Sequence, residues 1–437
     1  RWPRLGQRFL GTLMLNTPNE LLIWVHQASK SDIAALSIEV FEAARRGDRL
    51  ARGALARAST QLAEAGLACA RRLCKPGRPV EFVLVGGVLR NQPSFARRLA
   101  SELRRRRPAT SVRWLDRESA WGAVEMARRI VQPLAPTQPR SVPVQAESDA
   151  PCSWPIPRSV KLSPTEERNP RSLHLDRLSL VSAVKLMLRE DQRIPTALLK
   201  ERGPLVSAVR TIAKRLKRGG RLFYVGAGTS GRLGALDASE CPPTFSTPSE
   251  QVQAIVAGGQ RALWRSMEGA EDDAGAGADA IRYRGVKRRD VVLGIAASGR
   301  TPFVWGALHA ARRIGAATIL LCFNPHLHFE PGTRPDIVIS PSVGPEVLTG
   351  STRLKAGTAT KLVLNVITTL AMVQLGKVIS NLMVDVHPAN AKLRDRAVRI
   401  VQELTGTDAV AAHAALAKSG WSVRRALHRC AQTSHRS

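Results

Sequence analysis

Leu222-Phe-Tyr-Val-Gly226-Ala-Gly228-Thr-Ser-Gly231-Arg232 joins a short hydrophobic run to a glycine-rich turn. The hydrophobic residues predict a buried strand over 222–225, and the glycines match G-x-G-x-x-G at a strand-to-helix turn. Glycine at such a turn lets the backbone approach a phosphate, and the helix that follows offers unpaired N–H groups. The stretch therefore predicts an α/β fold with an anion site at the end of this strand.

The segments on either side extend this pattern into a whole domain. Helical periodicity runs over 178–218, and a helical piece without strand formers follows at 389–430. Further β-rich segments, separated by helical stretches, lie at 291–295, 318–323 and 337–340. Strands that alternate with helices predict a parallel, doubly wound sheet with helices on both faces.

The glycine-rich turn by itself does not identify the ligand. A dinucleotide fold would place an acidic residue about 20 positions further on, at the tip of the second strand, to bind the ribose. Here the sequence has Glu240-Cys-Pro-Pro-Thr244 instead, which predicts a loop broken by proline. Thr229 and Ser230 also place hydroxyls where a Rossmann turn has apolar or small residues.

Two further turns carry hydroxyl groups next to glycine. The strand at 291–295 runs into Ala297-Ser-Gly-Arg-Thr-Pro302, where proline suits the first turn of a helix. Thr349-Gly-Ser-Thr-Arg-Leu-Lys355 opens a helix that we expect over 351–376. Each turn could be an ordinary helix N-cap, but three that converge describe a phosphomonoester site better. The expected ligands are Thr229, Ser230, Ser298, Thr301, Ser351 and Thr352.

Carboxylates follow the first turn. Glu240 lies just after it, and Glu268 and Glu271, spaced i and i+3, would share one face of a helix. Two carboxylates near a bound sugar phosphate can act as acid and base if their surroundings separate their pKa values. A solvated acidic helix end is the alternative interpretation of residues 268–273.

Five longer motifs occur in order along the C-terminal part of the chain. They are YVGAGTSGRLGALDASECPPTF from Tyr224, MEGAEDD from Met267, GIAASGRTP from Gly294, GPEVLTGSTRLKAGTATK from Gly344 and NLMVDVHPANAKLRDRAV from Asn381. Together they closely resemble the N-acetylmuramic acid 6-phosphate etherases, which belong to the sugar isomerase (SIS) superfamily together with the glucokinase regulatory protein. The resemblance extends from an opening typical of these etherases, near Thr165, to about Cys430.

This resemblance implies cleavage of the D-lactyl ether of N-acetylmuramic acid 6-phosphate, with no metal or redox cofactor. It implies Glu240 as the acid and Glu271 as the base, with Glu268 as an alternative base or substrate ligand. Lys355 would add a counter-charge for the phosphate. A regulator that binds sugar phosphates without catalysis, similar to the glucokinase regulatory protein, is the alternative function.

His387 departs from the family pattern, in which we expect Gln or another polar residue. A histidine at this position could act as a ring-opening acid. We favour a surface histidine with no catalytic role, because nothing else in the chain supports a function special to this sequence.

The N-terminal part carries different motifs, AARRGD from Ala43, VLVGGV from Val83 and WGAVEMA from Trp121. They look like the C-terminal half of the BadF/BadG-type ATPases, actin-like ATPases that include N-acetylglucosamine kinases. In that fold Gly86 and Gly87 would lie beside the adenosine. The family's Asp-x-Gly-x-Thr phosphate loop is not found, and the chain begins at Arg1, so we expect half a kinase in a fragment of a longer product.

Eight prolines between residues 131 and 170 predict an extended linker. The expected domains are a partial ATPase at 1–133, the linker at 134–162, the SIS domain at 163–385 and a helical subdomain at 386–437. Within the first of these we expect helices at 33–70, 93–105 and 121–130 and a strand at 81–85.

Composition excludes several classes of protein. With 437 residues, 44% of them hydrophobic, the chain is not disordered as a whole, and its longest uncharged apolar run, 362–376, is shorter than the roughly 20 residues of a membrane span. The net charge of +31 is spread along the chain, so we expect no nucleic-acid partner. Six cysteines without a C-x-x-C spacing predict free thiols and no zinc site. We expect a cytoplasmic homodimer that binds a sugar phosphate.

Overall fold

The computed structural model describes residues 2–74, 78–114, 156–159, 161–267, 269–385 and 391–434. Apart from the first five residues, the chain divides into two compact units. One holds residues 6–24 together with 151–437, and the other holds 25–150. The expected helix at 121–130 and most of the expected linker lie outside the described residues.

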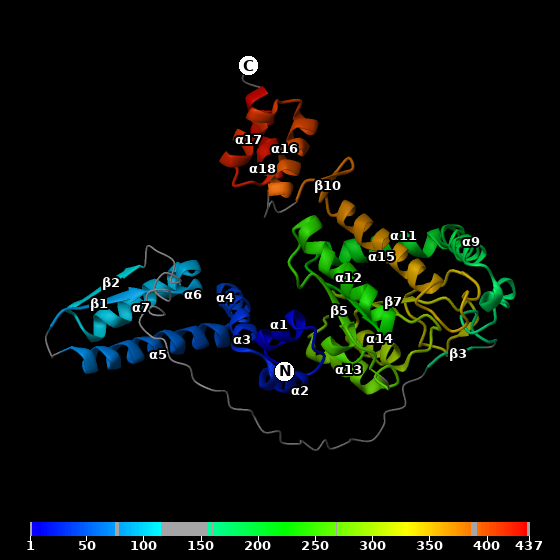
Figure 1. Ribbon diagram of the computed structural model, residues 1–437, viewed down its shortest axis with the longest axis horizontal. Helices are drawn as coiled ribbons and strands as arrows, with labels where there is room; N and C mark the ends of the chain where they lie inside the picture. Colours follow the sequence, from blue (N-terminus) through cyan, green and yellow to red (C-terminus); the bar gives the residue numbers. More distant parts are fainter. Residues whose placement is uncertain are drawn as a thin grey trace. The chain divides into compact units, whose positions relative to one another are not determined.

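A five-stranded parallel sheet forms the centre of the C-terminal unit, in the order β5-β4-β6-β7-β9 (Figure 1). Its strands are β4 (Leu222–Gly226), β5 (Val252–Val256), β6 (Val291–Ile295), β7 (Ala317–Leu321) and β9 (Ile337–Ile339). The chain leaves β4 for one neighbour and later returns on its other side as β6. A doubly wound sheet is therefore confirmed, with its topological switch point between β4 and β6.

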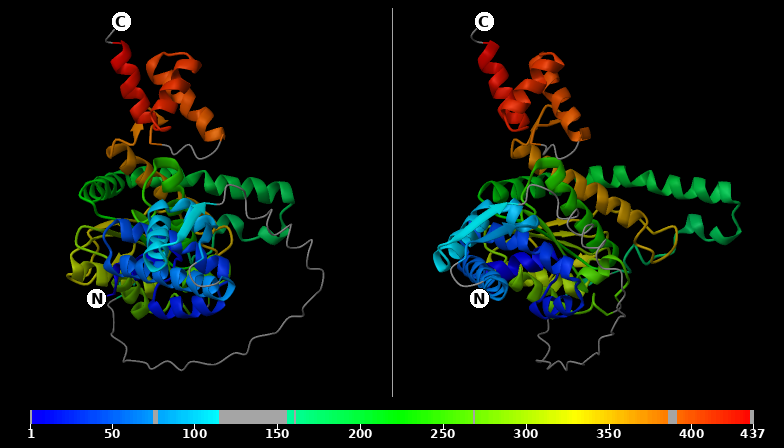
Figure 2. Two further views of the ribbon diagram at one scale, coloured as in Figure 1. Left: turned by 90° about the vertical axis from the view of Figure 1, so that its left-hand side faces the viewer. Right: turned by 60° about the vertical axis from the view of Figure 1, so that its left-hand side comes forward.

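Helices cover both faces of this sheet. On one face lie α10 (Arg193–Lys200), α11 (Arg202–Lys217), α12 (Gly228–Phe245) and α15 (Lys355–Gln374), and on the other lie α13 (Ala274–Tyr283) and α14 (Pro302–Ile314). Along β4, Leu222 and Tyr224 enter the first core and Phe223 and Val225 the second, because alternate side chains of a strand point to opposite faces. Figure 2 shows α11 and α15 side by side.

Within the part of the chain that the structure describes, α15 is the one helix long and apolar enough to cross a membrane. More than half of its most apolar stretch is buried inside the protein. Val363, Leu364 and Ile367 of this helix belong to the same core as the central strands. The helix is therefore part of the packed core of the domain.

The N-terminal residues 6–24 pack against the edge of the sheet at β5. The Asn16 side-chain amide donates to the carbonyl of Val256 at 2.8 Å. Arg284, only 2% exposed, donates to the carbonyl of Leu15 at 3.1 Å and to that of Ala254 at 3.3 Å. The carbonyls of this edge strand thus receive donors, which protects an edge that would otherwise be open.

The second unit is a smaller α/β arrangement. Its elements include α4 (Ser37–Arg45), α5 (Arg49–Leu73), β1 (Val80–Leu84), α6 (Gly87–Asn91), α7 (Pro93–Arg106) and β2 (Thr110–Trp114). The strands β1 and β2 pair in parallel, and Leu67, Leu99 and Leu103 lie in the core beneath them. The predicted strand at 81–85 and helix at 93–105 are confirmed to within one residue.

The last helices form a bundle of their own, with α16 (Ala391–Thr405), α17 (Ala409–Lys418) and α18 (Val423–Ser434) packed around Ile400, Val401 and Leu416. This confirms the predicted helical piece. The remaining elements are α1 (Arg4–Thr12), α2 (Pro18–Gln27), α3 (Lys30–Ala35), α9 (Leu180–Asp191) and the short pairs β3 (Arg158–Ser159) with β8 (Leu327–His328) and β10 (Val378–Ile379) with β11 (Leu382–Met383).

Candidate functional site

The first hydroxyl turn joins β4 to α12, and its glycines are required by close packing. A Cβ atom on Gly226 would lie 2.7 Å from the nitrogen of Gly231, and one on Gly231 would lie 2.6 Å from the oxygen of Gly226. Gly228 has a φ of 51°, in the left-handed region that favours glycine. These constraints hold the half-buried Thr229 and Ser230 in the first turn of α12.

The second turn lies beside the first, because β6 is the neighbour of β4 and Ile295 is opposite Gly226. The carbonyl of Ser298 accepts a hydrogen bond from the side-chain amide of Asn324 at 3.2 Å. The Trp305 indole donates to the carbonyl of Gly299 at 2.8 Å. Two buried side chains thus fix the backbone of the turn and leave the Ser298 hydroxyl at its half-buried surface.

The third turn precedes α15, which begins at Lys355 rather than at the expected residue 351. The cause is Glu346, whose carboxylate accepts the backbone N–H groups of Lys355 and Ala356 at 2.9 Å each and so fixes where the helix starts. Ser351 and Thr352 therefore lie in the turn before the helix, and both are half-buried.

The first and third turns lie next to each other. A Cβ atom placed on Gly357 would be 3.5 Å from the oxygen of Thr352 and 3.6 Å from the Cγ2 of Thr229. Since the second turn adjoins the first through the strand register, the structure brings the three predicted turns together at the carboxyl ends of β4 and β6. Ligands of doubly wound sheets bind at this edge, outside the switch point.

Helix capping does not account for the hydroxyl groups. The N-cap residues of α12, α14 and α15 are Ala227, Thr301 and Leu354, and none of the three caps its helix with a side-chain hydrogen bond. The alternative interpretation of the turns as ordinary N-caps is therefore wrong for all three helices. The hydroxyls of the three turns, together with the first N–H groups of α12, can bind an anion instead, whereas the first N–H groups of α14 and α15 already donate to the Glu271 carbonyl and to Glu346.

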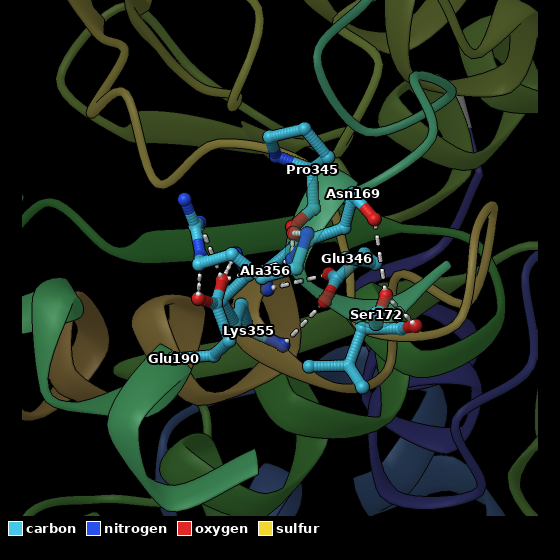
Figure 3. Close-up of polar contacts among 9 residues, drawn as sticks. Asn169, Ser172, Glu190, Pro345, Glu346, Lys355 and Ala356 are labelled. Carbon is cyan, nitrogen blue, oxygen red and sulfur yellow. Dashed lines mark hydrogen bonds and ion pairs between the residues drawn. The ribbon is translucent and has the colours of Figure 1, made fainter. Parts of the chain in front are cut away.

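Lys355 is completely buried, and its ammonium is already paired (Figure 3). Its Nζ lies 2.8 Å from Oε2 of Glu190, a side chain on α9 that is 2% exposed and that also binds Arg171 and Asn169. Burial alone would raise the pKa of this carboxyl. Hydrogen bonds from Arg171, Lys355 and Asn169 outweigh burial and lower the pKa of Glu190 to about 2.

The same network holds the loop before α15, as Figure 3 shows. Asn169 donates to the carbonyl of Pro345 at 3.2 Å, and the Ser172 hydroxyl donates to that of Val347 at 2.7 Å. No local pattern in the sequence assigns a function to Asn169, Glu190 or Glu346. Asn169 lies in the opening motif near Thr165, and Glu346 lies in the motif that begins at Gly344.

Glu271 lies in a turn beside the second hydroxyl turn. Its carbonyl accepts the backbone N–H of Phe303, in the first turn of α14, at 3.0 Å. The predicted helix over this acidic stretch is wrong for the described residues, because Gly269 has a φ of 74° and Asp273 instead caps α13 by accepting the N–H of Ala276. Glu268, like His387, lies outside the described residues.

Glu240 occupies an exposed position on α12. The prediction of a proline-broken loop at 240–244 is wrong, because the helix continues through Pro242 and Pro243 to Phe245. At 1.5 Å per residue, Glu240 lies about 15 Å along the helix from Ser230. The structure therefore gathers the turns and the Glu271 loop, and leaves Glu240 further along the same helix.

Within the ranges described here, no group of three or more His, Cys, Asp or Glu side chains could hold a metal ion. The chemistry available at this edge of the sheet comes from carboxylates, hydroxyls and backbone N–H groups. This set of groups suits anion binding and acid–base catalysis.

The chain is similar to several known proteins. The family model of the glucokinase regulatory protein N-terminal SIS domain matches residues 204–312. An N-acetylmuramic acid 6-phosphate etherase of Gloeobacter violaceus is 56% identical over 263 residues, which are 60% of this chain and 85% of the relative. The etherase of Symbiobacterium thermophilum is 52% identical, with 60% of this chain and 87% of the relative covered.

Solved structures are more distant. A phosphoheptose isomerase from Francisella tularensis is 15% identical with a TM-score of 0.33, covering 45% of this chain and 98% of that chain. A phosphoheptose isomerase from Neisseria gonorrhoeae is 18% identical with a TM-score of 0.30, and the match covers 45% of this chain and 100% of that chain. The identification rests on the sequence relatives: with 56% of 263 aligned residues identical across 85% of a relative, the chain belongs to the N-acetylmuramic acid 6-phosphate etherase family.

Proposed function

We propose that this chain is a carbon–oxygen lyase that converts N-acetylmuramic acid 6-phosphate and water into N-acetylglucosamine 6-phosphate and D-lactate in the recycling of cell-wall sugars. Besides the membership of this family, one structural observation supports the proposal. Three hydroxyl-bearing turns that cap no helix meet at the carboxyl ends of β4 and β6. A phosphate there would receive the N-terminus of α12 and hydroxyl donors from all three turns.

The reaction follows from the acidity of the open-chain sugar. The aldehyde at C1 acidifies the C2 proton, which the Glu271 carboxylate removes, or Glu268 in the alternative assignment. The electron pair forms the C2–C3 double bond while the ether oxygen leaves C3 with a proton from Glu240. Water then adds its oxygen to C3, giving its proton to Glu240, and Glu271 returns a proton to C2.

The phosphate site consists of the hydroxyls on the three turns. We propose that they orient the 6-phosphate while the N-terminus of α12 attracts its negative charge. Lys355 acts from beneath the third turn, since its ammonium binds Glu190 in the interior and its backbone N–H binds Glu346. The proposed ligands are Thr229, Ser230, Ser298, Thr301, Ser351 and Thr352.

The experiment is an assay of D-lactate released from N-acetylmuramic acid 6-phosphate by the purified chain, beside equilibrium dialysis of the same compound. The lyase predicts stoichiometric lactate and N-acetylglucosamine 6-phosphate. Binding with no lactate would favour a regulator similar to the glucokinase regulatory protein and would refute the lyase.

We also propose that the protein is a homodimer in the cytoplasm. Leu180, Val181, Val184 and Leu188 share one face of α9, and Leu180 and Leu188 are 80% and 60% exposed. Leu236, near Glu240 on α12, is 45% exposed. A second copy that covers such faces would remove apolar surface from water.

For the N-terminal unit we propose an origin in the C-terminal half of a BadF/BadG-type ATPase. In support, β1 leads into Gly86, whose φ is 111°, and Gly87 then begins α6. Glycine at this strand-to-helix turn leaves room for a nucleotide to approach the backbone.

A further inference from the structure

Asp237 lies one turn before Glu240 on α12, and the proposed reaction does not use it. Its Oδ2 accepts a hydrogen bond from the Tyr224 hydroxyl at 2.8 Å, and its Oδ1 lies 3.1 Å from the Thr368 hydroxyl. Tyr224 belongs to β4 and Thr368 to α15, and both side chains are buried. The Asp237 carboxyl therefore joins three elements beneath the exposed face that carries Glu240.

The helix around Glu240 needs such support. Pro242 and Pro243 have no N–H group, so the carbonyls of Ala238 and Ser239, four residues earlier, receive no helical hydrogen bond from them. The missing bonds flank Glu240 on its N-terminal side. The orientation of this turn consequently depends on side-chain contacts, and Asp237 supplies two.

The contacts of Thr368 bear on whether the Asp237 carboxyl is protonated or ionised. The Thr368 hydroxyl has one hydrogen, and its oxygen lies 2.9 Å from the carbonyl of Leu364, which can only accept. When that hydrogen serves Leu364, the contact with Oδ1 requires a hydrogen from Asp237. In the structure the Thr368 hydroxyl donates to Oδ1 of Asp237, and a protonated Asp237 would donate in the opposite direction, which leaves the Thr368 hydrogen to Leu364.

The surroundings favour the same form. Burial raises the pKa of Asp237, against the opposing effect of the hydrogen bonds from Tyr224 and Thr368 and of the Lys361 charge on α15. The other titratable neighbours are Cys241 and Glu240, both on α12. Burial raises the pKa of Cys241 to about 12, so this thiol stays neutral.

On the basis of the acid role proposed for Glu240, we infer that Asp237 is a positioning residue whose two hydrogen bonds hold the Glu240 turn against Tyr224 and Thr368. It touches no reacting atom. It aims Glu240 at the departing lactate oxygen and has no part in the removal of the C2 proton.

Two substitutions at this position separate the hydrogen bonds from the charge. In Asp237→Asn the amide oxygen accepts from Tyr224 and the amide nitrogen donates to Thr368, as the neutral acid does, so lactate release should stay close to wild type. Asp237→Ala removes both contacts and should lower kcat up to about 100-fold with KM unchanged. Exchange of the C2 proton with solvent deuterium should persist in both variants.

Thr368→Val removes one contact without changing the shape of the core. It should lower kcat by less than Asp237→Ala does, and the double variant should be no slower than Asp237→Ala alone, because the two residues act as a unit. Thr369→Val, at an exposed threonine next along α15, is the matched control and should be unchanged. Thr368→Val and Asp237→Asn keep the test decisive if Asp237→Ala does not fold.

The outcomes separate this inference from the proposed function. Wild-type kcat in folded Asp237→Ala, an equal loss in Asp237→Asn, or loss of C2 exchange together with lactate release would each overturn the positioning role. Glu240→Ala is measured beside them. If that variant releases lactate normally, the acid assignment and the role of Asp237 both fail. If Glu240→Ala does not release lactate, the acid assignment stands, and a contrary result for the Asp237 variants refutes the positioning role of Asp237 alone.

Discussion

Glu240 and Glu271 lie in different parts of the domain, one on an exposed helix and the other in a turn tied to α14. The acid and base roles proposed for them predict different effects of substitution. Glu240→Ala should lose D-lactate release yet still exchange the C2 proton with solvent deuterium, because the base is intact. Glu271→Ala should lose both. Nuclear magnetic resonance of the substrate in deuterated buffer follows the exchange, and survival of exchange only in Glu271→Ala would reverse the two roles.

Glu190 makes the protein sensitive to acid. Because its pKa is lowered from the usual 4.5 to about 2 in the folded state, its contribution to the free energy of unfolding is complete above pH 4.5 and is lost as the pH falls toward 2. The shift corresponds to roughly 3 kcal/mol. Glu190→Gln should lose about this much stability at neutral pH.

The measurement is urea unfolding at a series of pH values for wild type, Glu190→Gln and the control Glu167→Gln, an exposed carboxylate in the same part of the chain. Between pH 4.5 and 2, the free energy of unfolding of the wild type and of the control should fall more steeply than that of Glu190→Gln. If the free energy of unfolding fell with pH in parallel for all three proteins, the ion pair of Glu190 would contribute nothing to stability in this pH range.

Individual residues were predictable where a local pattern carried them. The hydroxyls of the three turns follow from glycine and strand signals within a few positions of each other. The partner of Lys355 does not, because Glu190 is 165 positions away and only the packing of α9 against α15 brings them together. A counter-charge for phosphate and a buried structural lysine have the same sequence signal.

Helices and strands show the same division between local and long-range causes. Strands β4 and β6 were predicted from continuous hydrophobic runs, whereas β5, whose run is interrupted by Gln253, was missed. Prolines at 242 and 243 predicted a loop, yet helix α12 continues through them because its other face packs on the sheet and on α15. Tertiary packing overrode local propensity there.

The tight joint between β4 and α12 gives a prediction of its own. A Cβ on Gly231 would lie 2.6 Å from the oxygen of Gly226 and 2.8 Å from the Cγ1 of Val256, so Gly231→Ala must displace the helix start. We expect a loss of about 1–3 kcal/mol in stability and a marked fall in kcat/KM. Thermal melts and lactate assays measure both.

Gly203→Ala is the matched control, because a Cβ on Gly203 meets nothing within 4 Å. It lies in α11, where alanine is favoured over glycine by about 1 kcal/mol, so this variant should be slightly more stable and fully active. A Gly231→Ala variant that melts and turns over like wild type would show that the close packing does not constrain the phosphate turn.

The molecule as a whole presents apolar surface that a single chain does not cover. If α9 lies in a dimer interface, the double variant Leu180→Glu/Leu188→Glu should shift the mass measured by light scattering from dimer to monomer. Val410→Glu, at an apolar residue of α17 that is likewise 80% exposed, should leave the mass unchanged. A dimer that survives both changes, or a wild-type monomer, would contradict the interface at α9.

The large positive charge of the chain is a second property of the whole molecule. Its +31 arises mostly from arginines spread along the sequence. The absence of a nucleic-acid partner stays a prediction that follows from this spread.

The dependence of catalysis on the 6-phosphate tests the central claim most directly. The three turns are proposed to hold this dianion, and its binding energy then orients C2, C3 and the ether oxygen for the two glutamates. The measurement compares D-lactate release from N-acetylmuramic acid with and without the 6-phosphate at equal concentration. We predict turnover only with the phosphorylated sugar, and comparable rates on the two sugars would contradict the phosphate site at these turns.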